Sequence, residues 1–341
     1  MNSSAVQILL EAEALLDIRR LGPALVLFDY AEAAGEDPDR CAAGRWMVHM
    51  LTGDFASAWN ESDAIRSRGA PDPHRFWQGE DLCGKRVIVR CLHGLGDTVQ
   101  FVRYAPLLEN MAASVIWEVP HALLDLALRF RAVRHVTTWE HERHRKWDVQ
   151  LEVMELPYIF RTELPDLPLA TNYLHLPHTS TRPSTKPQIG IVWSAGEWNL
   201  SRSIPLHLLL PVLSRNDCEF WNLQGGLVRD TWNDLDCPGL RDSPACNSGV
   251  ASLAAVISHL DLIITVDTLA AHLAGALGIP AWVMLQYAAD WRWMVGRADS
   301  PWYPSLRLFR QPSAGDWDSL VVSLNASLDH WLGITQGRLV A

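Results

Sequence analysis

The chain has 341 residues, and at roughly 150 residues per domain this length predicts about two domains and a smaller appendage. Its 29 Lys and Arg and 39 Asp and Glu give a net charge of −10, so we expect no nucleic-acid partner. The six Cys form no C-x-x-C pair, which argues against a disulfide framework or a zinc knuckle and suits a reducing compartment. With no basic leader and no run of about 18 apolar residues, we expect a cytoplasmic chain without a transmembrane segment.

Residues 1–70 are predicted to be all-helical, because they are rich in Ala and Leu, have helical periodicity and contain no β-branched runs. LGPALVLFDYAEA and GDFASAWNESDAI align so that Ala24 and Ala58 fall 34 residues apart, the period of tetratricopeptide repeats. Repeat arrays need about three units, so a plain pair of helical hairpins is an equal alternative. We expect this segment to dock the acceptor, to bind a protein partner or to self-associate.

A stretch rich in Pro and Gly at residues 69–84 ends the helical pattern, and from residue 85 short β-rich runs alternate with helical stretches. This alternation is typical of a parallel sheet with helices on both faces. A linker rich in Pro, Ser and Thr at residues 174–188 separates two series of elements. The first series comprises RVIVRC, a helix over 98–110, SVIWEV, a helix over 121–130 and DVQLEV. The second comprises IGIVWS, CEFWNLQ, a helix over 248–260, DLIITVD, a helix over 268–278, AWVML and a last helix from about residue 316.

The two series predict the α/β fold class, with a pair of doubly wound, Rossmann-like domains that face each other across a cleft. The first domain spans residues 85–175 and the second residues 188–333, after the small all-helical segment. The last helix could cross back to the first domain. In such sheets ligands bind beyond the carboxyl ends of strands, where loops lead into helix N-termini.

One such loop has the sequence LHGLGDT. Gly94 and Gly96 permit a tight turn and a close backbone approach, and Asp97 stands at the start of the following helix. A dinucleotide-binding motif needs Gly or Ala where Val99 stands, although Glu118 lies where a ribose-binding acid would be, so an NAD site stays an alternative. Asp97 either caps the helix or performs chemistry.

A second loop lies in DLIITVDTLAAHLAGALGIP, an apolar strand that ends at Asp267 and is followed by a helix. The Thr268 hydroxyl, the first N–H groups of that helix and His272 one turn later could together hold a diphosphate. The alternative is a capped core helix with a buried histidine.

Several segments resemble the heptosyltransferase-like glycosyltransferases of family 9, which have the two-domain GT-B fold, and in particular bacterial members with tetratricopeptide-like helices before the transferase. GLGDTVQFVRYAP is similar to the glycine–aspartate motif of the first domain, and VDTLAAHLAGALGIP to the diphosphate motif of the second. GIVWSAGEWNLSRSIPL resembles the loop that supplies a cation to the leaving phosphates. DWRWMVGRADSPWYPSLRLFRQPSAGDWDS is similar to the tail of the repeat-bearing members, and the resemblance covers roughly residues 74–333.

The chain departs from this family at three positions. Arg202 stands where a Lys is usual, and Arg binds phosphate bidentately, so the role can survive with altered geometry. Leu269 replaces a Gly after the Asp–Thr pair, and Pro106 lies about one helical turn later than in the lipopolysaccharide enzymes. For these reasons neither an ADP-heptose donor nor a particular acceptor is inferred.

The resemblance implies an inverting transfer from a nucleotide-sugar donor to a hydroxyl of a glycan, protein or small-molecule acceptor, with Asp97 as general base. Preorganised cationic and N–H groups would meet the charge on the departing diphosphate, so no metal and no cofactor is expected. Asp267 is expected to hold its loop by accepting backbone N–H bonds. The implied donor-binding residues are Ser194, Arg202, Gln224, Asp267, Thr268, Leu269 and His272. The implied acceptor or cleft residues are His93, Gly94, Gly96, Gln100, Trp291 and Arg292.

Two other classes of function stay open: a nucleotide-sugar epimerase or other nucleotide-binding enzyme, and a catalytically silent, transferase-derived binding protein. Asp-x-Asp pairs raise the further option of a metal site, and the HERH stretch contains His141 and His144 at helical spacing. We expect instead that the Asp-x-Asp pairs occur by chance and that the HERH stretch lies in a solvated loop. Of the Trp residues near the C-terminus, Trp282 is predicted to lie in the core, whereas Trp291 and Trp293 are candidates for the cleft. The Asp-x-Asp pairs lie at 37/39, 234/236 and 316/318.

Overall fold

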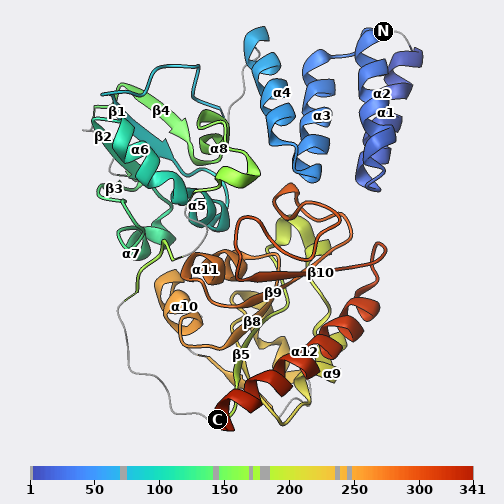
Figure 1. Cartoon of the computed structure of the whole chain (residues 1–341), viewed down its shortest axis with the longest axis vertical. Helices are drawn as coiled ribbons and strands as arrows, with labels where there is room; N and C mark the ends of the chain where they lie inside the picture. Colours follow the sequence, from blue (N-terminus) through green and yellow to red (C-terminus); the bar gives the residue numbers. More distant parts are fainter. Residues whose placement is uncertain are drawn as a thin grey trace.

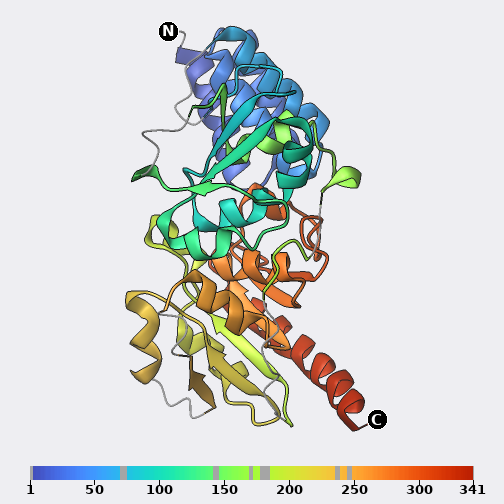
Figure 2. The same cartoon turned by 90° about the vertical axis from the view of Figure 1, so that its left-hand side faces the viewer.

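The computed structural model describes residues 3–69, 75–140, 146–168, 172–176, 185–234, 239–243 and 248–340. It contains a helical segment followed by two parallel sheets, each flanked by helices (Figure 1). Figure 2 shows these parts stacked along the long axis, with the helical segment and the C-terminus at opposite ends. The predicted fold, a GT-B-like pair of Rossmann-like domains behind N-terminal helices, is confirmed.

The helical segment consists of two antiparallel hairpins. Asp37 and Asp54 cap the N-termini of the third and fourth helices by accepting backbone N–H bonds, and Gly53 ends the third helix in the left-handed conformation with φ 81°. Ala24 and Ala58, the residues aligned at the repeat period, are both fully buried. The assignment of these hairpins as tetratricopeptide units stays a prediction. The helices are α1 (Ser3–Asp17), α2 (Leu21–Ala33), α3 (Pro38–Thr52) and α4 (Phe55–Arg68).

The first sheet is parallel, with strand order β3-β2-β1-β4. Its strands are β1 (Arg86–Arg90), β2 (Ser114–Glu118), β3 (Val136–Thr137) and β4 (Val149–Glu152), and its α-helices are α5 (Leu95–Phe101), α6 (Ala105–Met111), α7 (Leu124–Ala127) and α8 (Leu156–Ile159). The single helix predicted over 98–110 is wrong: helix α5 starts at Leu95, and a 3-10 turn separates it from α6. Pro106 explains the break, because its ring would clash with the carbonyl one turn earlier in a continuous α-helix.

The second sheet is also parallel, with order β10-β9-β8-β5-β6-β7. The apolar sides of α12 pack on it through Leu320, Leu324 and Leu328, so the described side chains of this last helix stay with the second domain. The strands are β5 (Gln188–Val192), β6 (Glu219–Asn222), β7 (Leu240–Asp242), β8 (Leu262–Val266), β9 (Ala281–Leu285) and β10 (Leu306–Arg310). The helices are α9 (Leu210–Leu213), α10 (Val250–Ile257), α11 (Leu269–Leu277) and α12 (Trp317–Val340).

A buried polar cluster joins the two domains. Arg103, fully buried just after α5, donates to the carbonyl of Trp302 at 2.7 Å and to the hydroxyl of Tyr173 at 3.2 Å. The Tyr303 hydroxyl lies 3.4 Å from that of Tyr173 and 3.0 Å from Nδ1 of His272 on α11. Because these groups come from both domains, they fix α5 against α11.

Candidate functional site

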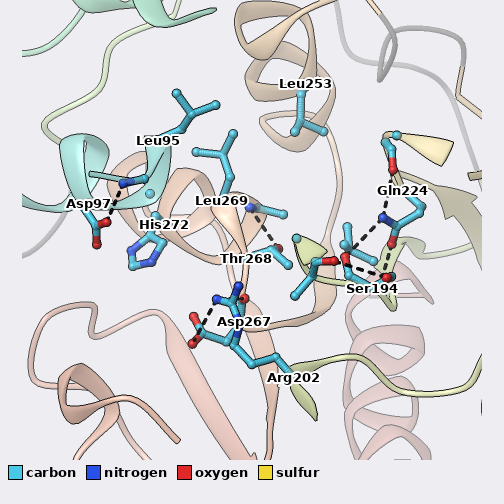
Figure 3. A pocket seen from close by; sticks show the side chains of 18 of the residues that line it. Leu95, Asp97, Ser194, Arg202, Gln224, Leu253, Asp267, Thr268, Leu269 and His272 are labelled. Carbon is cyan, nitrogen blue, oxygen red and sulfur yellow. Dashed lines mark hydrogen bonds and ion pairs between the residues drawn. The ribbon is translucent and has the colours of Figure 1, made fainter. Parts of the chain in front are cut away.

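A cavity of about 960 Å³ lies between the two domains, at the carboxyl ends of their strands. The loop after β1 and the start of α5 form one wall, and the loops after β5, β6 and β8 form the opposite wall. Figure 3 shows Asp97 on the first wall and Thr268 and Arg202 on the second. Of the predicted site residues, those that line the cavity are His93, Gly94, Gly96, Asp97, Ser194, Arg202, Gln224, Asp267, Thr268, Leu269, His272 and Arg292.

Asp97 uses its two carboxylate oxygens differently. Oδ2 accepts the backbone N–H of Gly94 at 2.8 Å, so Asp97 caps the start of α5 from the third helical position. Oδ1 accepts a hydrogen bond from Nη2 of Arg292 at 2.6 Å, and the carboxylate keeps 22% of its side-chain surface exposed to the cavity. Asp97 therefore both caps helix α5 and lines the candidate site.

Arg292 reaches Asp97 from the second domain and is itself held on several sides. Its Nη1 donates to Asp290 Oδ1 at 2.7 Å, and its guanidinium lies over the rings of Trp291 and Phe101, 4.7 and 5.6 Å from the ring centroids. Burial would lower the pKa of Arg292, but the negative charges of Asp290 and Asp97 outweigh it and hold that pKa above its ordinary value. The guanidinium of Arg292 therefore stays charged at any physiological pH.

Helix α11 presents its N-terminus to the cavity. Thr268 is the N-cap, and its hydroxyl accepts the backbone N–H of Ala270 at 3.3 Å and lies 3.0 Å from the hydroxyl of Thr265. Leu269, where a Gly was expected from the family pattern, places its side chain at the cavity wall. The positive end of the α11 dipole thus faces the opening, where it favours an anion.

Arg202 supplies a cation beside this helix start. Its Nη1 donates to the backbone carbonyl of Asp267 at 3.1 Å and lies 3.8 Å from Asp267 Oδ2. Burial raises the pKa of Asp267 to about 6, and the charge of Asp290 adds to this effect. The prediction that the Asp267 carboxylate accepts backbone N–H bonds is wrong for the described residues, because that carboxylate faces Arg202 instead.

Ser194 and Gln224 form the far end of the second wall. The Gln224 Oε1 accepts the backbone N–H groups of Trp193 and Ser194 at 3.1 and 2.8 Å, and its Nε2 donates to the carbonyls of Ser194 and Gly225. The Ser194 hydroxyl lies 3.2 Å from that of Ser203. Gln224 therefore ties together the loops after β5 and β6, a structural task that leaves its amide little capacity for a ligand.

His272 lies between the two helix starts. Its Nδ1 is 3.0 Å from the Tyr303 hydroxyl, and a Cβ placed on Gly96 would come within 2.6 Å of its Cδ2. Gly96 thus permits the close approach of α5 to α11, and it also lines the cavity. Burial, with the nearby charges of Arg292, Arg103 and Arg202, lowers the pKa of His272 to about 3, so the ring is neutral.

His93 lines the cavity beside a buried carboxyl group. Its Nε2 lies 3.9 Å from Oε2 of Glu152, which stands at the end of β4 and accepts the N–H of Met154 at 2.6 Å. Burial raises the pKa of Glu152 to about 8, and the charges of Glu155 and Asp97 add to this.

Three predicted cleft residues, Gln100, Trp291 and Trp293, do not line the cavity. Gln100 is fully buried on α5, and neither atom of its side-chain amide has a hydrogen-bond partner among the described residues. Trp291 packs between Trp46 and Phe101, at ring-centroid distances of 5.7 and 6.3 Å, and Trp293 is fully buried beside His272. Large aromatic rings fill cores more often than clefts, and here they do. Trp282, predicted to be in the core, is buried.

The structure weakens the alternative of an NAD site, because the acid expected to bind the ribose is already paired. Glu118 is buried at the end of β2, and both of its carboxylate oxygens accept hydrogen bonds from Nη1 of Arg90, at 2.7 and 2.8 Å. A carboxylate engaged in this way is a poor partner for a ribose hydroxyl.

The Asp-x-Asp pairs whose side chains the structure describes, 37/39 and 316/318, do not form a metal site. Asp37 and Asp316 cap helices by accepting backbone N–H bonds, and Asp39 pairs with Arg68. Within the described residues, no three His, Cys, Asp or Glu side chains are grouped so that they could hold a metal ion. The side chains of the 234/236 pair, and His141 and His144, lie outside the described residues.

Sequence reasoning missed other cavity residues. Asp290 follows strand β9 and fixes Arg292, Gly225 and Gly226 follow β6, and Met154 follows β4. The rule that ligands meet the carboxyl ends of parallel strands would have pointed to all three loops.

In the described part of the chain, no helix is long and apolar enough to cross a membrane.

Comparison with known proteins identifies others that are similar to this chain in sequence or in fold. No protein-family model matches the chain. Protein FlbA of Caulobacter vibrioides is 26% identical over 361 residues, an alignment that covers 90% of this chain but only 58% of FlbA. The dodecameric heptosyltransferase TibC of Escherichia coli, in its complex with ADP-D-β-D-heptose, is 10% identical with a TM-score of 0.50, over 77% of this chain and 79% of that one.

A family 9 glycosyl transferase from Veillonella parvula gives a TM-score of 0.46 at 13% identity, over 73% of this chain and 90% of that one. The likeness to TibC shows a shared two-domain architecture. It agrees with the fold that the alternation of strands and helices predicts.

Proposed function

We propose that the chain is an inverting, metal-independent glycosyltransferase that moves a sugar from a nucleotide sugar to an acceptor hydroxyl. The observation that carries this proposal is that helix starts from two domains meet at one cavity. The α5 start brings the Asp97 carboxylate, and the α11 start brings Thr268 with Arg202 beside it. A carboxylate facing an anion-binding helix start is the arrangement that this transfer needs.

The donor diphosphate belongs at the α11 start. The dipole of this helix favours negative charge at its start, the Thr268 hydroxyl lies at that start, and Arg202 can add bidentate hydrogen bonds. TibC, which has a similar fold, was crystallised with a nucleoside diphosphate sugar, and this supports the same class of donor here.

The acceptor belongs on the side of Asp97 and His93. Its hydroxyl donates to Asp97 Oδ1, because a carboxylate oxygen can accept a second hydrogen bond beside the one from Arg292. The acceptor oxygen then bonds to the anomeric carbon, the bond from that carbon to the diphosphate oxygen breaks, and the proton passes to Asp97. The nucleoside diphosphate leaves with the electron pair, and the anomeric configuration is inverted.

The test is an assay of nucleoside diphosphate release from a panel of nucleotide sugars with candidate acceptors, in the presence and absence of excess EDTA. We expect acceptor-dependent release that EDTA does not abolish, with an inverted product by NMR. A complete loss that Mn²⁺ restores would overturn metal independence. Conversion of the sugar without any acceptor would favour an epimerase, and the absence of turnover with intact nucleotide binding would favour a silent binding protein.

A further inference from the structure

The turn that carries Asp290 and Arg292 into the cavity is strained and depends on contacts outside its own domain. It spans residues 287–295 after strand β9, with a single 3-10 turn at Trp291–Trp293. Met294 has φ 52°, a left-handed conformation that costs free energy in any residue other than glycine. Such a turn persists only when its surroundings hold it.

The helical segment supplies these surroundings on the side away from the cavity. Arg19, in the turn between α1 and α2, donates from Nη2 to the carbonyl of Ala289 at 2.7 Å. The hydroxyl of Tyr287 donates to the carbonyl of Ile18 at 3.2 Å, at the same turn of the helical segment. The α1–α2 turn therefore holds the first half of the 287–295 turn by two hydrogen bonds.

Helix α3 holds the second half. The backbone N–H of Val295 donates to the carbonyl of Leu51 at 2.9 Å, and Trp46 packs edge-on against Trp291 with ring centroids 5.7 Å apart. The next residue along, Arg292, makes the 2.6 Å contact with Asp97. A continuous set of contacts thus runs from the helical segment through the turn to Asp97.

We propose that the helical segment is a positioning element of the active site. Through Arg19, Trp46 and Leu51 it holds the 287–295 turn in the one conformation that places Arg292 against Asp97. This role differs from docking an acceptor, because the helical segment contacts the 287–295 turn on the side away from the cavity. The consequence for turnover rests on the proposed function, whereas the effect on the turn itself does not.

The experiment compares Arg19→Gly with the matched control Arg20→Ala. Arg19 has φ 59°, so glycine can adopt the same backbone conformation without strain while the guanidinium is removed. Arg20 is the adjacent, exposed arginine, and its side chain makes no cap hydrogen bond. The readouts are amide hydrogen exchange over residues 287–295 by mass spectrometry, and kcat and KM for transfer.

In Arg19→Gly we expect exchange over 287–295 to quicken by about tenfold while residues 262–268 of the donor side stay unchanged. We expect kcat to fall by about tenfold and the donor KM to stay within about twofold, because misplacing a group near the reacting atoms lowers turnover more than binding. Arg20→Ala should behave like the unmodified chain. Unchanged exchange would overturn the proposal, and so would faster exchange with an unchanged kcat. If the unmodified chain shows no transfer, the exchange result alone decides, and only the proposed function fails.

Discussion

In our proposal, the Asp97 carboxylate both caps a helix and takes part in the reaction. From the sequence, capping and catalysis were competing interpretations. In the structure Oδ2 makes the capping bond to Gly94, and Oδ1 faces the cavity and Arg292. The two tasks use different oxygens and do not exclude each other.

Replacing Asp97 with Asn separates the two tasks. The amide oxygen of Asn can still accept the Gly94 N–H, so the start of α5 should survive, but an amide cannot take a proton. We expect transfer to fall by at least about a hundredfold while nucleotide affinity stays within a few-fold. Transfer rates with calorimetric nucleotide affinities check this, and turnover equal to that of the unmodified chain would leave Asp97 with capping alone.

Arg202 is the residue that we expect to meet the leaving diphosphate. Removing one charged contact of this kind costs about 2–4 kcal/mol in the transition state, so Arg202→Ala should slow transfer by about two to three orders of magnitude. Arg202→Lys keeps the charge but loses the bidentate fork, and it should recover part of the rate. Steady-state kinetics of both variants provide the measurement. An Ala variant with an unimpaired rate would remove Arg202 from the donor site.

At the scale of elements, the contact between α5 and α11 sets the distance across the cavity. Gly96 has no room for a side chain, because a Cβ there would lie 2.6 Å from Cδ2 of His272 and 3.1 Å from Nε2. The ring cannot easily move, since the Tyr303 hydroxyl holds its Nδ1. The two helix starts are therefore packed directly against each other.

Gly96→Ala should push these helices apart. We expect a loss of about 1–3 kcal/mol in the free energy of unfolding, as for other overpacked cores, together with reduced transfer. Gly22→Ala in α2 is the matched control, because nothing lies within 4 Å of its Cβ position and Ala favours helix. Denaturant unfolding of both variants is the measurement. Equal stability of Gly96→Ala and the unmodified chain would show that the contact can relax.

The sequence predicted the strongly apolar elements well and the short or polar ones poorly. Runs such as LIITV, residues 262–266, are buried on both faces of a parallel sheet, so their composition alone identifies them. β3 has only two residues, and β10 carries Arg307 and Arg310, so neither gives an apolar run. Helix α5 began earlier than predicted because Asp97 acts at the third helical position and Gly94 is the cap.

At the scale of the whole molecule, the pairing of the two domains and the loops that meet between them followed from strand alternation and the carboxyl-end rule. The partners of each site residue did not. The Asp97–Arg292 pair joins residues 195 positions apart, and the contacts of the helical segment with the 287–295 turn join residues still farther apart. Sequence spacing carries no signal for such contacts, because they depend on how complete domains pack.

A crystal structure with a nucleoside diphosphate or nucleotide sugar bound would decide where the donor lies. We expect the phosphates at the start of α11, within hydrogen-bonding reach of Thr268 and with Arg202 closed over them, and the sugar directed toward Asp97. A nucleotide on the Gly94–Asp97 loop, with the α11 start empty, would overturn the proposed donor site and return the first domain to a dinucleotide-binding interpretation.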